Sequence, residues 1–195
     1  MNKITTLLLA GAFAVSAATS AAAQTDPPPF GGPADVSFAN QLWAAMTEAR
    51  LVGPNALKTT TYQGGTGLHA TTLTALQGMV AVEANNGLAI VKNNFAGAEG
   101  KDVTDADIIE RPQDFGGPTT VMYQRKGFDP ENQDWFWAVY KPNGDVVVNP
   151  LGLNMAGRIV GGNAMPEAPF NCVACHKGAP GNDMVFLHDA VPEIK

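Results

Sequence analysis

The chain has 195 residues and a formal net charge of −6 at pH 7, and it lacks the run or patch of Lys and Arg that binding to nucleic acid requires. Its 21 Gly and 14 Pro predict many turns and short elements rather than long helices. Without residues 1–23, whose only charged residue is Lys3, roughly 170 residues remain, enough for one domain with one hydrophobic core.

Residues 1–23 have the features of a secretory signal peptide. A positively charged start precedes an apolar run from Ile4 to Val15, and the segment ends in three alanines, a small-residue cleavage site. The run is too short to span a membrane, and no stop-transfer segment follows it. Gln24 stands where a lipoprotein would need a cysteine. We therefore expect cleavage near Ala23, export and no membrane span.

After the signal, the sequence predicts a flexible leader at 24–34 and a single domain at 35–195. Asp35 is a suitable cap for a helix that runs to about Leu51, and Gly53-Pro54 would end it. The helix is indicated by apolar residues at helical spacing, namely Phe38, Leu42, Met46 and Ala49. Residues 55–77 have weak periodicity and predict a loop with at most one helical turn.

Strands dominate the next part of the chain. Residues 79–83 and 88–92 predict a hairpin whose turn lies at 84–87, because Asn-Gly is a strong hairpin signal. A loop is expected at 93–118. Further strands are expected at 119–125, at 134–141 and, after a Pro-Asn-Gly-Asp turn, at 146–148.

The strand at 134–141 is apolar on both faces. One face carries Trp135, Trp137 and Val139, and the other carries Phe136, Ala138 and Tyr140. Such a pattern indicates a strand buried in the middle of a sheet. The order of elements predicts an α+β domain, an antiparallel β-sheet with an N-terminal helix and a short C-terminal helix next to the motif at 172–176.

That motif is Cys172-Val173-Ala174-Cys175-His176, and it contains the only two cysteines of the chain. The C-x-x-C-H pattern is typical of covalent attachment of haem c, in which both thiols become thioethers. His176 would then bind the haem iron from the proximal side. Haem attachment in bacteria follows export, so the motif and the signal peptide together predict a periplasmic protein.

Three other interpretations of the two cysteines compete with haem attachment. A C-x-x-C redox motif normally precedes a helix in a strand-helix-strand setting, and no such alternation surrounds these residues. A structural zinc site needs four ligands, and the chain has no second cysteine pair. A disulfide between residues so close in sequence would stabilise the fold very little.

Several segments resemble the cytochrome P460 family, which includes the cytochromes c′-beta. They are Ile-Val-Lys-Asn-Asn-Phe at 90–95, Thr-Val-Met-Tyr at 120–123, Gly-Phe-Asp-Pro at 127–130, Asp-Trp-Phe-Trp-Ala-Val-Tyr at 134–140, the haem motif, and Asn-Asp-Met-Val-Phe at 182–186. The resemblance covers the chain from about residue 36 onward.

The resemblance implies a homodimer of antiparallel-sheet domains, each with one haem c whose distal side is open to small ligands. A periplasmic redox partner is also expected, and the acidic composition is compatible with a basic one. Family members with a lysine cross-linked to the haem oxidise hydroxylamine, whereas others bind nitric oxide. It therefore indicates small nitrogen oxides as ligand or substrate. It leaves open a hydroxylamine-oxidising oxidoreductase and a non-catalytic nitric-oxide binder; an electron-transfer cytochrome is a third hypothesis.

Two catalytic candidates follow from the resemblance. Lys92 lies in the segment similar to the family's lysine-bearing region, with Lys101 and Lys126 as nearby alternatives. Glu167 is the candidate for the base that accepts protons from a bound N–H substrate. For both Lys92 and Glu167, an ordinary solvated side chain is the competing interpretation.

Other side chains are candidates for the surroundings of the iron. Possible sixth ligands are His69, His188, Met155, Met165 and Met184. Phe95, Phe128 and Phe186 are candidates for the wall of a dry distal pocket. Surface positions for the histidines and core positions for the methionines are the alternatives.

Overall fold

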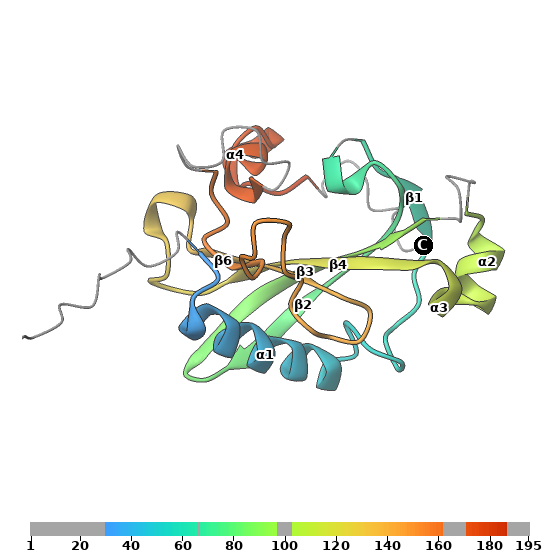
Figure 1. The fold of residues 1–195 in the computed structure, drawn as a ribbon, viewed down its shortest axis with the longest axis horizontal. Coiled ribbons are helices and arrows are strands. Elements are labelled where there is room, and N and C mark those ends of the chain that lie inside the picture. The colour runs from blue at the N-terminus through green and yellow to red at the C-terminus, as the bar shows by residue number, and fades with distance from the viewer. Residues whose placement is uncertain (1–29, 66, 97–102, 162–170, 187–195) are drawn as a thin grey trace, which may run out of the picture.

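The computed structural model describes residues 30–65, 67–96, 103–161 and 171–186. In this part of the chain a six-stranded antiparallel sheet carries an N-terminal helix on one face and the short helix of the cysteine motif on the other (Figure 1). The α+β prediction is therefore confirmed. The predicted signal peptide, Lys101, Met165, Glu167 and His188 lie outside the described residues. Among the described helices, none is long and apolar enough to cross a membrane.

Each strand pairs with its neighbours in the sequence, so the sheet order equals the chain order. The strands are β1 (Thr61–Gln63), β2 (Thr72–Val82), β3 (Asn85–Phe95), β4 (Gly116–Gln124), β5 (Trp135–Tyr140) and β6 (Ala156–Gly157). Short connections between consecutive antiparallel strands suffice for this topology. The Gly- and Pro-rich composition is consistent with it.

Helix α1 (Pro33–Glu48) begins and ends earlier than the sequence predicted. Pro33 occupies the first turn, where its missing N–H costs no hydrogen bond. Asp35 is not the cap but lies in this turn, and its carboxylate accepts a hydrogen bond from the Gly31 N–H at 3.1 Å. The helix ends before Arg50, which has a φ of 59°. Phe30 is buried, so the structured domain begins inside the predicted leader.

The β2–β3 hairpin turns earlier than predicted. The strands pair up to Val82 opposite Asn85, so Glu83 and Ala84 alone form the turn, with Glu83 at a φ of 54°. Gly87 lies inside β3, where a Cβ atom would come within 2.0 Å of the Gln124 carbonyl oxygen. This glycine therefore permits close approach of the neighbouring backbone rather than a turn.

Three other segments differ from their predictions. The expected loop at 55–77 contains β1, the 3₁₀ turn η1 (Gly67–His69) and the start of β2. The expected loop at 93–118 contains the end of β3, α2 (Asp105–Glu110), α3 (Pro112–Phe115) and the start of β4. The expected strand at 146–148 makes only isolated bridges, from Val146 to Tyr140 and from Val148 to Asn154. The sequence did not predict the short elements, because their apolar residues show only weak periodicity.

The two faces of the sheet bury different cores, as the pattern of β5 predicted. Phe136, Ala138 and Tyr140 pack under α1, whereas Trp135, Trp137 and Val139 face the other side. β5 lies between β4 and β6 in the sheet, and all of its residues are buried because one core covers each of its two faces. The second core also contains Val173 of α4 (Cys172–His176). The cysteine motif is thus held on the face of the sheet opposite α1.

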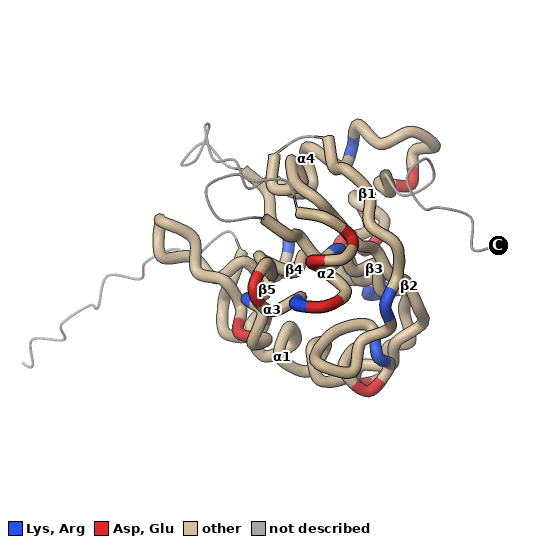
Figure 2. The backbone as a smooth tube through the Cα atoms, turned by 90° about the vertical axis from the view of Figure 1, so that its right-hand side faces the viewer, with Lys and Arg blue, Asp and Glu red and all other residues tan. Residues whose placement is uncertain are grey.

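Acidic and basic residues are interspersed along the described chain (Figure 2). Some pair directly, as Arg158 does with Asp129 at 2.9 Å and with Glu131 at 3.3 Å.

A matched pair of tyrosines offers a test of the packing under α1. The buried Tyr140 hydroxyl donates a hydrogen bond to the Ala39 carbonyl at 2.8 Å, so Tyr140→Phe should lower the free energy of unfolding by about 0.5–1.5 kcal/mol. The buried Tyr62 hydroxyl has no hydrogen-bond partner among the described residues, so Tyr62→Phe should not destabilise the protein. Urea unfolding followed by circular dichroism measures both; equal losses would contradict this assignment.

Candidate functional site

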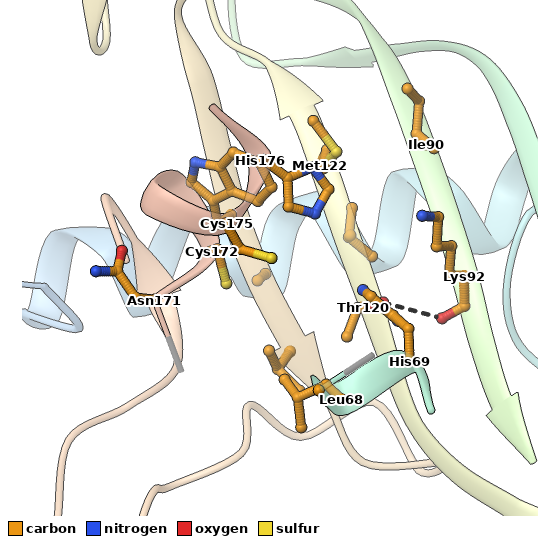
Figure 3. Close-up of a pocket in the computed structure, with 15 residues that line it drawn as sticks. Leu68, His69, Ile90, Lys92, Thr120, Met122, Asn171, Cys172, Cys175 and His176 are labelled. Atoms are coloured by element: carbon orange, nitrogen blue, oxygen red, sulfur yellow. Dashed lines mark hydrogen bonds between the residues drawn. The ribbon is translucent and has the colours of Figure 1, made fainter. Parts of the chain in front are cut away.

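A pocket lies on the sheet face opposite α1, between the sheet, α4 and η1 (Figure 3). Its volume, including the part open to solvent, is about 640 Å³. The side chains around it are Ile90, Lys92, Thr120, Val121, Met122, Trp137, Ala138 and Val139 from the sheet, Asn171, Cys172, Cys175 and His176 from α4 and its cap, and Gly67, Leu68 and His69 from η1. The lining is mainly apolar.

Helix α4 consists of the cysteine motif itself. Asn171 caps it, because its Oδ1 accepts a hydrogen bond from the Ala174 N–H at 2.9 Å. Cys172, Cys175 and His176 occupy positions i, i+3 and i+4, which share one face of a helix. Both sulfur atoms point toward the pocket that His176 also borders (Figure 3). The spacing of the motif therefore brings two thiols and one imidazole to a single site.

The His176 ring is buried and held on several sides. It packs against Trp137 and Phe186, with ring centres 4.7 Å and 5.3 Å away. Its Nδ1 lies 2.7 Å from the Met184 carbonyl oxygen. A carbonyl only accepts hydrogen bonds, so Nδ1 carries the hydrogen and Nε2 keeps its lone pair. Burial also lowers the pKa of His176 to about 4, which keeps the ring neutral, as a metal ligand must be.

The Met184 carbonyl reaches His176 because the chain turns back after α4. Asn182 and Met184 have φ values of 61° and 65°, which are uncommon for residues other than glycine. The turn also brings the Asp183 carbonyl to accept a hydrogen bond from the Trp135 indole N–H at 3.2 Å. These contacts hold the tail segment, and with it the acceptor that orients His176, against the sheet.

The two cysteines are not joined by a disulfide. Burial raises the pKa of the Cys172 thiol to about 12, whereas redox-active C-x-x-C motifs have a thiol whose pKa is lowered. Within the described part of the chain, no three His, Cys, Asp or Glu side chains are grouped so that they could hold a metal ion. Among the described residues, no further ligand therefore joins the pair to form a zinc site.

Lys92 projects from β3 into the pocket (Figure 3). Alternate residues of a strand share a face, so Lys92 lies on the same face as Ile90 and Asn94. It is only 8% exposed, and its burial lowers its pKa. A lysine in this environment is closer to its neutral, nucleophilic form. Lys126 is exposed on the loop after β4 and does not line the pocket.

Most of the other candidates are found elsewhere. Met155 is part of the core beside the pocket, and Met184 contributes its backbone carbonyl rather than its sulfur. Phe95 packs with Val103 and Ile108, and Phe128 packs on the α1 side, so the prediction that these two line the pocket is wrong. Phe186 contacts the His176 ring but is not among the residues around the pocket.

The structure brings one more sequence candidate, His69, to the pocket, and it adds residues that the sequence did not single out. His69 Nδ1 lies 3.2 Å from Asn94 Oδ1. Asn94 and Thr120 were not expected at the site, and Trp137 was expected only in the core. The alternation of Ile90, Lys92 and Asn94 along β3 was the available signal for Asn94.

These residues meet the requirements for holding a haem c. Two neighbouring thiols and an imidazole with a free Nε2 border one apolar pocket, and the imidazole is oriented by a backbone acceptor. Lys92 and His69 border the same pocket, and Glu167 and His188 lie outside the described residues. Comparison with models of protein families, with curated proteins and with solved structures finds no match to this chain.

Proposed function

We propose that this protein is a periplasmic mono-haem c-type cytochrome that acts on small nitrogen oxides, in the manner of the cytochrome P460 family that its sequence resembles. One observation carries the proposal: Cys172, Cys175 and His176 border the same apolar pocket. The hydrogen bond from His176 Nδ1 to the Met184 carbonyl leaves Nε2 of this ring free to bind a metal. A haem bound there would supply a redox-active iron at which a small nitrogen oxide can bind and be oxidised.

The protein side chains would provide anchoring, orientation and exclusion of water. Cys172 and Cys175 would hold the haem as thioethers, and the Met184 carbonyl would keep His176 turned toward it. Ile90, Met122 and the other apolar side chains of the lining would limit access of water. Glu167 remains the proposed proton acceptor for hydroxylamine oxidation, because the resemblance implies an acid in this region of the chain.

Lys92 is the lysine that we propose for the link to the haem implied by the resemblance, because it is buried in the pocket and has a lowered pKa. A non-catalytic nitric-oxide-binding protein is the second candidate function. The apolar lining favours it, because such a pocket offers little hydrogen bonding to a polar ligand. A homodimer remains a prediction from the resemblance, and a periplasmic redox partner remains a prediction as well.

The test is to express the full chain in a bacterium that attaches haem in its periplasm. A denaturing gel stained for haem should be positive, and the intact mass should equal that of the chain from Gln24 plus one haem. A strongly red-shifted Soret band that is lost in Lys92→Leu and retained in Lys126→Leu would support the lysine-linked oxidase. Turnover of hydroxylamine with an artificial electron acceptor should then be measurable.

Two results would change the proposal. An ordinary c-type Soret band that Lys92→Leu leaves in place, with nitric oxide binding and no hydroxylamine turnover, would favour the nitric-oxide binder. A protein exported and cleaved near Ala23 but without covalent haem would refute the proposed function.

A further inference from the structure

Two imidazoles face the same pocket from segments that are far apart in the sequence. His176 belongs to α4, and His69 is the last residue of η1. Their ring centres are 6.5 Å apart, and their ring planes are inclined by 78°. In Figure 3 both labelled rings border the same space.

Asn94 determines which nitrogen of His69 is free. Its Nδ2 donates a hydrogen bond to the Pro118 carbonyl at 2.6 Å, so the amide oxygen is the atom that faces His69 at 3.2 Å. That oxygen accepts, so His69 Nδ1 carries the hydrogen and Nε2 has a free lone pair. Asn94 is only 3% exposed and lies where the β3–β4 register shifts, a kind of irregularity that often directs a side chain to a site.

The same reasoning applies to His176, whose Nδ1 donates to the Met184 carbonyl. Both rings therefore have an oxygen acceptor on Nδ1 and a free Nε2, the arrangement that orients histidine as a metal ligand. When two imidazoles bind one metal from opposite sides through bonds of about 2 Å, their ring centres lie roughly 6 Å apart. The observed 6.5 Å is close to this separation.

The number of ligands points to haem iron rather than to a free ion. Among the described residues, no third His, Cys, Asp or Glu joins such a pair to complete a metal site. Two protein nitrogens are, however, sufficient for an iron whose other four positions are filled by the macrocycle.

We propose that His69 is the second axial ligand of the iron, opposite His176. This inference rests on the proposed haem function and adds a control of access to it. A small nitrogen oxide must displace His69 before it can bind. Displacement is feasible because His69 lies half-buried in a three-residue 3₁₀ turn, and among the described residues its ring hydrogen-bonds only to Asn94.

The test uses the haem-loaded full chain and does not depend on its activity. The oxidised wild-type protein should be low-spin in its absorption and electron paramagnetic resonance spectra, with the strongly anisotropic signal expected for nearly perpendicular imidazole planes. His69→Ala should be high-spin, and added imidazole should restore the low-spin spectrum. In the reduced wild type, the rate of carbon monoxide binding should level off at high concentration, because His69 dissociation becomes limiting. In His69→Ala the rate of carbon monoxide binding should rise linearly with the carbon monoxide concentration.

The matched control is His188→Ala, which removes the third histidine of the chain and should remain low-spin. Lys92 and Met122 also border the pocket, and near-infrared magnetic circular dichroism of the wild type distinguishes them from histidine without any substitution. Three results would refute the role of His69 and leave the proposed function standing. They are a wild type that carries haem but is high-spin, a wild-type spectrum of His–Lys or His–Met ligation, and a His69→Ala variant that stays low-spin. Absence of haem on the gel would refute both the proposed function and the role of His69.

Discussion

Replacing both Cys172 and Cys175 with serine is expected to abolish covalent haem, with complete loss of haem staining on a denaturing gel. Serine has no thiol and so forms no thioether, and the two side chains are the only cysteines in the chain. The fold should persist, because Cys172 is half-buried and Cys175 is exposed. Each single variant retains one thiol and should show weaker staining rather than none.

Ala174→Ser is the matched control for the cysteine variants. It introduces a serine at an exposed position of the same short helix and should leave staining at the wild-type level. Circular dichroism of all four variants separates loss of attachment from loss of folding. If the double variant folds and still carries haem that survives denaturation, thioether attachment through this motif is refuted.

Leu42→Ala is expected to cause the largest loss of stability among the substitutions considered, about 2–5 kcal/mol in the free energy of unfolding. Leu42 projects from α1 into the core beneath the sheet and is 0% exposed. Alanine favours the helix at least as well as leucine, so the loss reports packing alone. It combines the transfer free energy of the missing methyl groups with the cost of the cavity that they leave.

Leu57→Ala makes the same chemical change at a side chain that is 48% exposed. Its effect should lie within about 0.5 kcal/mol of zero. Urea unfolding followed by far-UV circular dichroism compares the two variants under one condition. Similar losses at both positions would contradict the placement of α1 against the sheet.

Some features of this protein were determined by local sequence. The strict alternation from Trp135 to Tyr140 assigned each side chain to the correct face of the sheet, because a strand places successive residues on opposite sides. The motif at 172–176 identified Cys172, Cys175 and His176 as one group, because its spacing brings them to one face of a helical turn. Such features depend only on neighbours along the chain.

Local signals failed where a distant segment decides the conformation. The Asn-Gly pair at 86–87 predicted a turn, yet Gly87 lies within β3, where the β4 backbone approaches it too closely for a Cβ atom. The short elements α2 and α3 were missed because they bury little apolar surface. Phe95 and Phe128 were candidates for the pocket wall as aromatic side chains, and only the tertiary packing places them in other clusters.

By itself, the sequence determined the antiparallel α+β class, the two faces of β5 and the grouping of Cys172, Cys175 and His176. Only the tertiary structure buried Lys92 beside those residues and brought His69 to within 6.5 Å of His176. The physical reason is that sequence spacing fixes which side of an element a residue occupies. Which elements face each other across a pocket depends on strand register and on buried hydrogen bonds, such as those of Asn94 and the Met184 carbonyl.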